Sequence, residues 1–149
     1  QDFVTIVGLM RDDPRVEHQN IFAVGFSNGG FWVCYLAGTL QVNAGVAHYG
    51  VWKANYGKAF RNPYPMKYFS SLGAPVLALH GAEEGTQKLV RGGKAGDMAK
   101  ANGAPLEIHV YPDADHAWDR KGSKHWPYNE EVDKDSHKRT IEFFKKHMK

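Results

Sequence analysis

The amino-acid sequence predicts an α/β protein, a three-layer sandwich with a mainly parallel sheet. Four short apolar segments are bounded by Gly, Pro or Asn, as buried strands usually are. Segments with helical patterns alternate with them, which is typical of layered α/β folds. The strands are apolar almost throughout, as expected for a parallel sheet that is covered on both faces. The length of 149 residues favours one domain, residues 1–149.

Each expected element has its own signal. Residues 29–38 follow a glycine-rich turn and are apolar. Residues 86–102 carry Leu89, Val90 and Met98, although the neighbouring glycines weaken the helical pattern. Residues 136–148 place Ile141, Phe143 and Phe144 on an amphipathic pattern. In chain order we expect a partial helix at 3–11, a strand at 20–25, a helix at 29–38, a strand at 42–49, a loop with a short helix at 51–72, a strand at 75–80, a helix at 86–102, a strand at 106–111 and a helix at 136–148.

Composition excludes several classes of protein. Hydrophobic residues make up 42% and charged residues 23%, as in ordinary globular domains. The net charge of +3 is spread along the chain, which argues against a nucleic-acid partner. No apolar run approaches 18 residues, so we expect no membrane span. Cys34 stands alone, so it indicates neither an internal disulfide nor a compartment. The chain starts at Gln1 without a visible signal peptide, so we expect a processed or cut start and leave localisation open.

The stretch Gly25-Phe26-Ser27-Asn28-Gly29 matches a nucleophile elbow, in which a strand turns sharply into a helix with a serine at the tip. Side chains two positions before and after the serine would collide, so glycine is expected at both positions. The backbone N–H of Asn28 opens the helix and would face a developing oxyanion. The alternative interpretation is a glycine-rich turn without chemistry.

A serine hydroxyl needs a base, and the base needs an orienting acid. In this kind of fold the chain order is nucleophile, acid, base. Glu83 and Glu84 follow the third expected strand, and His116 follows the fourth. The carboxyl ends of parallel strands meet at one edge of the sheet, where active sites lie. The sequence therefore predicts that Ser27, a glutamate and His116 converge there.

The other histidines have simpler interpretations. His80 and His109 are expected to pack inside the fold, whereas His48 ends a strand close to the predicted site and is a candidate for a direct role there. No Cys, His or carboxylate spacing matches a metal cage, so no metal site is expected.

With these residues placed, the chain resembles the dienelactone hydrolase family of α/β-hydrolases from about residue 12 to its C-terminus. The resemblance is carried by Gly25-Phe26-Ser27-Asn28-Gly29-Gly30, Tyr49-Gly50, His80-Gly81 and His116-Ala117-Trp118. It also covers Asp13-Pro14-Arg15-Val16, Pro75-Val76-Leu77, Tyr111-Pro112, Arg139-Thr140 and Phe143-Phe144. It implies hydrolysis of a small ester or lactone without a cofactor.

The resemblance also implies roles for single residues. Ser27 takes the position of the nucleophile and His116 that of the base. The acid falls on Glu84, where the family usually has Asp, with Glu83 as the alternative. Arg120 stands where the family has an arginine that holds a substrate carboxylate, and a plain surface arginine is the competing interpretation. Two aromatic residues would line the substrate pocket, Tyr49 and Trp118, with Trp52 as a further candidate.

The sequence departs from the family pattern in length. Family members have about four more strands before the elbow strand, and a loop among them supplies a second oxyanion N–H. We therefore expect the C-terminal half of such a protein or a shortened form. The strand at 20–25 would have an open edge, which invites cover by residues 3–11, a partner chain or a second copy. Self-association through this edge is the prediction.

Three functions remain open at this point. The first is a serine hydrolase acting on esters or lactones. The second is a weakly active or inactive binding module that kept the elbow, which the short chain and the glutamate at the acid position favour. The third is a prolyl oligopeptidase-like peptidase or a polyhydroxybutyrate depolymerase-like esterase, because both contain Ser-Asn-Gly-Gly.

Overall fold

The computed structural model describes residues 2–53, 65–83 and 94–149. Its sheet contains four strands in the order β1-β2-β3-β4, and all neighbouring strands are parallel. The strands are β1 (Phe22–Phe26), β2 (Ala44–His48), β3 (Val76–Gly81) and β4 (Leu106–Tyr111). The predicted α/β architecture with a parallel sheet is confirmed. Spatial order follows chain order along the whole described sheet.

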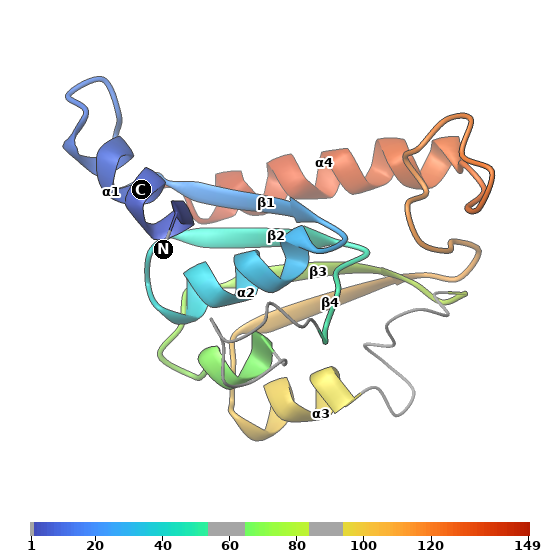
Figure 1. Cartoon of the computed structure of the whole chain (residues 1–149), viewed down its shortest axis with the longest axis horizontal. Coiled ribbons are helices and arrows are strands. Elements are labelled where there is room, and N and C mark those ends of the chain that lie inside the picture. Colours follow the sequence, from blue (N-terminus) through green and yellow to red (C-terminus); the bar gives the residue numbers. More distant parts are fainter. Residues whose placement is uncertain (1, 54–64, 84–93) are drawn as a thin grey trace.

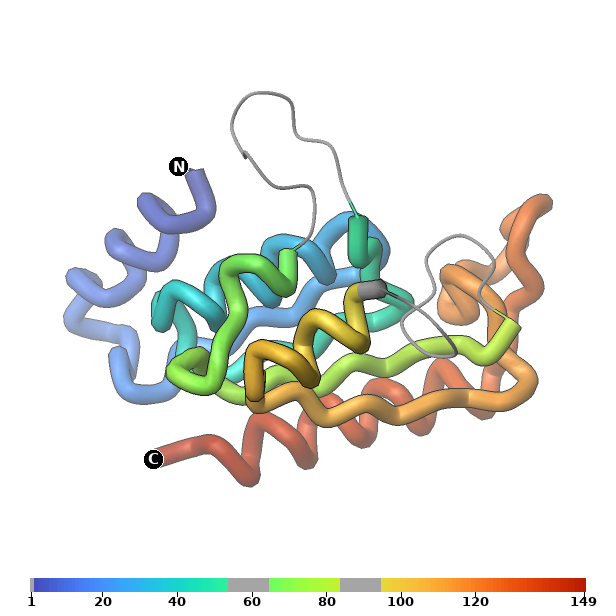
Figure 2. Tube along the Cα trace, turned by 90° about the horizontal axis from the view of Figure 1, so that it is seen from below, coloured from blue at the N-terminus to red at the C-terminus, as the bar shows by residue number. Residues whose placement is uncertain are grey.

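Helices cover the two faces of this sheet, as Figures 1 and 2 show. The long helix α4 lies along one face, and α1, α2, η2 and α3 lie on the other. The bounds are α1 (Asp2–Asp12), α2 (Gly29–Gly38), η2 (Pro65–Tyr68), α3 (Lys94–Ala101) and α4 (Glu130–Lys146). The layers follow from the strands, because β2 and β3 are buried at every position and need cover on both faces.

Two apolar clusters fill the spaces between the layers. The cluster on the α2 side includes Val33, Leu36 and Phe69. The cluster on the α4 side includes Leu79, Trp118 and Phe143. Both α2 and the two central strands are apolar nearly all round, which fits elements buried between neighbours.

Helix α4 begins six residues before the start predicted from the sequence. Its amphipathic apolar residues lie mainly after residue 136, and so the pattern alone misses the first turns. The side chain of Asn129 caps the helix by accepting a hydrogen bond from the N–H of Val132 at 3.2 Å. Glu130, Glu131 and Asp133 then stabilise the positive end of the helix dipole.

The other elements lie close to the predicted ranges, within the part of the chain that is described. Helix α3 covers the end of the predicted helix at 86–102, whose first residues lie outside the described part. The predicted loop at 51–72 contains η2 near its end, and residues 54–64 are likewise not described. No described helix is both long enough and apolar enough to cross a bilayer.

Strand β1 forms one edge of the described sheet. Helix α1 does not lie over this edge strand. It packs beside α2, where the ring centroids of Phe3 and Trp32 are 5.0 Å apart. Arg11 donates to the carbonyl of Gln41, in the segment after α2. Val24 and Phe26 on β1 are 49% and 41% exposed.

Candidate active site

The side chains of Ser27 and His116 meet at the carboxyl edge of the sheet. The Ser27 Oγ and His116 Nε2 atoms are 2.9 Å apart, a hydrogen-bond distance. Ser27 follows β1 directly and His116 lies in the loop after β4, so the contact spans the ends of the two outer strands. His116 is buried, whereas Ser27 remains partly accessible to solvent.

Backbone strain is concentrated at this edge. Of the four non-glycine residues with positive φ in the described chain, three lie here, Ser27 at 52°, Tyr49 at 37° and Ala117 at 53°. Each such conformation costs on the order of 1–3 kcal/mol and persists only where the surroundings hold it. Hydrogen bonds hold Ser27 from both sides, since its N–H donates to His48 and its carbonyl accepts from Val51.

The glycines around Ser27 have unequal roles. A β-carbon at Gly25 would lie 2.4 Å from the backbone of Gly29, so no side chain fits there. At Gly29 an added β-carbon meets nothing within 4 Å, so the sequence-based expectation that both positions need glycine is wrong for Gly29. Gly30 does need its small size, because a β-carbon would lie 2.6 Å from Gly50. Helix α2 is thereby packed against the end of β2.

A pocket of about 220 Å³ opens beside Ser27. Its lining residues are Phe26, Ser27, Tyr49, His116, Ala117, Arg120 and Trp126. The walls are mainly aromatic, and the exposed Arg120 supplies the one positive charge among the lining residues. The ring of Trp126 lies 5.0 Å from that of His116, measured between centroids. This pocket has the apolar lining with few polar groups that small-molecule sites share.

Sequence reasoning missed three of these wall residues, Phe26, Ala117 and Trp126. Phe26 stands between Gly25 and Ser27, and the elbow turns its side chain to the pocket. Trp126 sits in an irregular loop without a sequence pattern, so only the folded chain brings it to His116.

The predicted role of Trp118 is wrong. It was expected to line the substrate pocket, but its side chain is fully buried and is not among the lining residues. It packs behind Tyr49, with 4.8 Å between ring centroids, and its indole N–H donates to Ser136 at 3.3 Å. Trp118 therefore fixes the loop to α4 from behind. Trp52 is also buried, at 1% exposure, and does not line the pocket.

The structure describes Glu83 and the oxyanion donor Asn28, but not Glu84. Glu84 lies outside the described residues. Glu83 is exposed, and its N–H donates to the carbonyl of Ala114 at 3.1 Å. Asn28 is the N-terminal cap residue of α2, directly after Ser27, in helical conformation. Its backbone N–H therefore belongs to the positive end of the helix dipole.

His48 lies behind the site and is not part of the pocket. It is almost completely buried, and its Nε2 lies 2.8 Å from the hydroxyl of Thr140 on α4. Burial and the neighbouring His137 lower the pKa of His48 to about 4, against a smaller opposite effect of Asp119. A neutral His48 thus joins β2 to α4 and supports Ser27 through its carbonyl.

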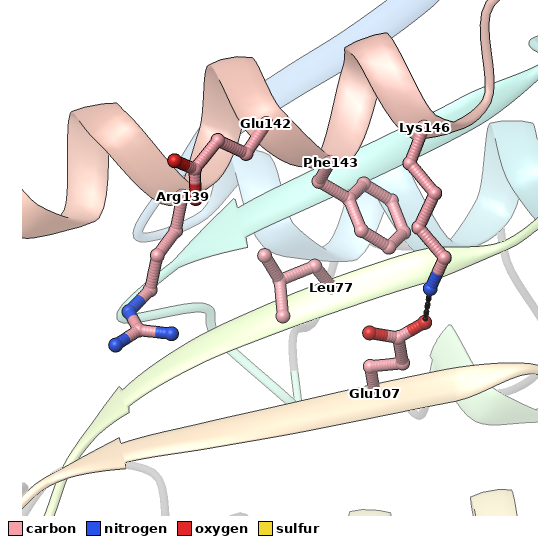
Figure 3. Close-up of a pocket in the computed structure, with 6 residues that line it drawn as sticks. All are labelled: Leu77, Glu107, Arg139, Glu142, Phe143 and Lys146. Atoms are coloured by element: carbon pink, nitrogen blue, oxygen red, sulfur yellow. Dashed lines mark hydrogen bonds and ion pairs between the residues drawn. The ribbon is translucent and has the colours of Figure 1, made fainter.

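A second pocket of about 200 Å³ lies between α4 and the last two strands (Figure 3). Its residues are Leu77, Glu107, Arg139, Glu142, Phe143 and Lys146. Among these residues Lys146 and Glu107 form an ion pair at 2.8 Å. The lining contains neither a hydroxyl nucleophile nor an imidazole, so it offers no chemistry of the kind found at Ser27. Within the described chain no cluster of three or more His, Cys, Asp or Glu residues could hold a metal ion.

Comparison with known proteins identifies the family of this chain. The sequence profile of the dienelactone hydrolase family matches residues 1–148. The chain belongs to the dienelactone hydrolase family. A crystal structure described as that of a dienelactone hydrolase from Klebsiella pneumoniae subsp. pneumoniae superposes with a TM-score of 0.76 at 28% identity, over 96% of this chain and 58% of the other.

Two relatives illustrate the range of the sequence similarity. A protein of Escherichia coli (strain K12) named carboxymethylenebutenolidase is 33% identical over 132 residues, which is 85% of this chain and 46% of the relative. Dipeptidyl-peptidase 5 of Porphyromonas gingivalis is 31% identical over 144 residues, covering 78% of this chain and 21% of the peptidase. The chain thus spans under half of the one and about a fifth of the other.

Proposed function

We propose that this member of the dienelactone hydrolase family is a serine hydrolase that cleaves carboxylic esters or lactones. The observation that carries the proposal is the 2.9 Å contact between Ser27 and His116 at the tip of a strained elbow. The contact lies beside a small, mainly aromatic pocket, which suits a small-molecule substrate rather than a macromolecule.

The chemistry follows from the two side chains. His116 accepts the hydroxyl proton at Nε2 while Oγ of Ser27 forms a bond to the carbonyl carbon. The tetrahedral intermediate collapses, and the alkoxide leaves with the proton from His116. Water then attacks the acyl-enzyme with His116 again as base, which releases the acid and restores Ser27. For a lactone, the leaving alkoxide stays attached to the acyl group until this second step.

The remaining roles are part of the same proposal. Glu84 orients His116, with Glu83 as the alternative, and the N–H of Asn28 stabilises the oxyanion. Arg120 at the pocket rim would attract a substrate that carries a negative charge. Comparing Glu84→Gln with Glu83→Gln assigns the acid, because only the substitution of the true partner of His116 should lower turnover, by about 10²-fold or more.

A fluorophosphonate probe tests the proposal directly. We expect the probe to label the protein, and we expect Ser27→Ala to abolish labelling while Ser71→Ala, at an exposed serine before β3, leaves it unchanged. Labelling that persists in Ser27→Ala would mean that another residue reacts. A wild-type protein that folds and is not labelled would favour the inactive binding module instead.

A peptidase is the second candidate, and the 31% identity to dipeptidyl-peptidase 5 supports it. Esters and amides pass through similar intermediates, so the same site serves both. Hydrolysis of short p-nitrophenyl esters and of aminoacyl p-nitroanilides discriminates between them. The ester proposal requires a higher kcat/KM for the esters and little turnover of the amides.

A further inference from the structure

One hydrogen bond links the strand end beside Ser27 to the loop that carries His116. The hydroxyl of Tyr49, directly after β2, donates to Oδ1 of Asp119 at 2.7 Å. Resting on the function proposed above, we propose that Asp119 is a positioning residue that acts through Tyr49. It holds the imidazole of His116 in reach of the Ser27 hydroxyl.

The Tyr49 end of this link is tied to the nucleophile. The residue before Tyr49, His48, accepts the N–H of Ser27 at 3.1 Å, and Val51 donates to the carbonyl of Ser27 at 2.8 Å. The N–H of Tyr49 itself donates to Leu79 on β3 at 2.8 Å. Tyr49 therefore stands on the same rigid backbone that holds the strained serine.

The Asp119 end is tied to the base. Asp119 follows His116 by three residues, in a turn closed by the N–H of Arg120 donating to Ala117 at 3.1 Å. The buried ring of Tyr49 lies edge-on to the ring of His116, with 4.9 Å between centroids. Fixing the Tyr49 ring therefore also fixes one wall against which the imidazole rests.

The hydrogen bond between Tyr49 and Asp119 is strong, and the phenol stays protonated. A neutral hydroxyl donating to a carboxylate forms a charge-assisted hydrogen bond, which is stronger than a bond between neutral groups. Burial and the Asp119 carboxylate both raise the pKa of Tyr49, so the phenol keeps its proton at any pH where the hydrolase would work. The loop after β4 has its own strained residue, Ala117, and a tether of this kind offsets the tendency of the loop to relax.

The test measures the rate of fluorophosphonate labelling and the kcat and KM for p-nitrophenyl acetate in matched variants. Asp119→Leu and Tyr49→Phe each remove the bond, and we expect each to lower kcat and the labelling rate about tenfold with KM little changed. The double variant should lose no more than either single variant. Asp119→Asn should recover part of the rate, since its amide oxygen can accept the same hydrogen bond without the charge that strengthens it.

Asp113→Leu is the control, because Asp113 is an exposed carboxylate in the same loop. It should leave both rates unchanged. Urea unfolding of each variant gives its folded fraction, to which the rates are normalised. If Asp119→Leu does not fold, Tyr49→Phe and Asp119→Asn still carry the test.

Failure of the proposed hydrolase function and failure of the Tyr49–Asp119 link give different results. An unlabelled wild-type protein contradicts the proposed hydrolase and not the link. A labelled wild type with equal rates in Tyr49→Phe and Asp119→Leu overturns the link alone. Additive losses in the double variant would show that the two residues act separately. An Asp119→Asn variant as slow as Asp119→Leu would show that charge, not the hydrogen bond, matters.

Discussion

Ser27 and His116 are separated by 89 positions in the sequence, and 2.9 Å separates Oγ of the serine from Nε2 of the histidine. Three parallel pairings, β1 with β2, β2 with β3 and β3 with β4, bring the two loops to one edge. This pairing of hydroxyl and imidazole is what the proposed chemistry requires.

Removing the imidazole should remove most of the activity. We expect His116→Gln to lower kcat/KM for p-nitrophenyl acetate by about 10²–10⁴-fold, since the hydroxyl loses its general base. His18→Gln is the control, because His18 is exposed on the loop before β1. Steady-state kinetics of the two variants check this, and equal activity in both would remove His116 from the mechanism.

The two glycines that flank Ser27 should respond differently to alanine. Gly25→Ala places a β-carbon 2.4 Å from the backbone of Gly29, so the elbow must shift and labelling of Ser27 should be lost. Gly29→Ala meets no atom within 4 Å and should keep both fold and labelling. Circular dichroism and probe labelling of the pair measure this. Equal tolerance at both positions would show that the turn is looser than the structure has it.

Acid should destabilise the protein through His48. The unfolded ring takes up a proton near its ordinary pKa of 6.5, whereas the pKa in the fold is lowered to about 4 by burial. The unfolded state therefore binds more protons below pH 6.5. This contribution to stability is complete above pH 6.5 and falls by roughly 3 kcal/mol as the pH approaches 4.

His48→Gln tests the effect, because a glutamine amide can still donate to Thr140 and does not titrate. We expect the free energy of unfolding in urea to depend less steeply on pH between 6.5 and 4 in this variant. Parallel curves for the variant and the wild type would assign the acid sensitivity to other groups.

Self-association through the open edge at β1 remains a prediction. Val24 and Phe26 leave apolar surface exposed there, and on the β4 edge the exposed Ile108 is accompanied by the ion pair of Glu107 with Lys146 (Figure 3). Charged side chains discourage edge pairing and apolar ones invite it. We expect concentration-dependent association that Val24→Lys weakens and Ile108→Lys, on the β4 edge, does not. Sedimentation velocity measures this, and a wild type that stays monomeric contradicts it.

The sequence by itself determined the layers and the succession of strands and helices along the chain. Strands and buried helices carry apolar patterns that are local, so β4 and α2 were predicted with their observed ends. The elbow at Ser27 was also visible locally, because the turn needs glycine at Gly25. The start of α4 was not, since its first turns are set by the cap at Asn129 rather than by apolar periodicity.

Tertiary structure decided which side chains meet at the site. Trp118 and Trp126 are both aromatic residues after His116, yet one is buried behind Tyr49 and the other lines the pocket. The link from Tyr49 to Asp119 likewise joins residues 70 positions apart. Such choices depend on how the loops after β2 and β4 pack against each other. Local sequence patterns cannot carry that information, because packing is fixed only when distant segments share one space.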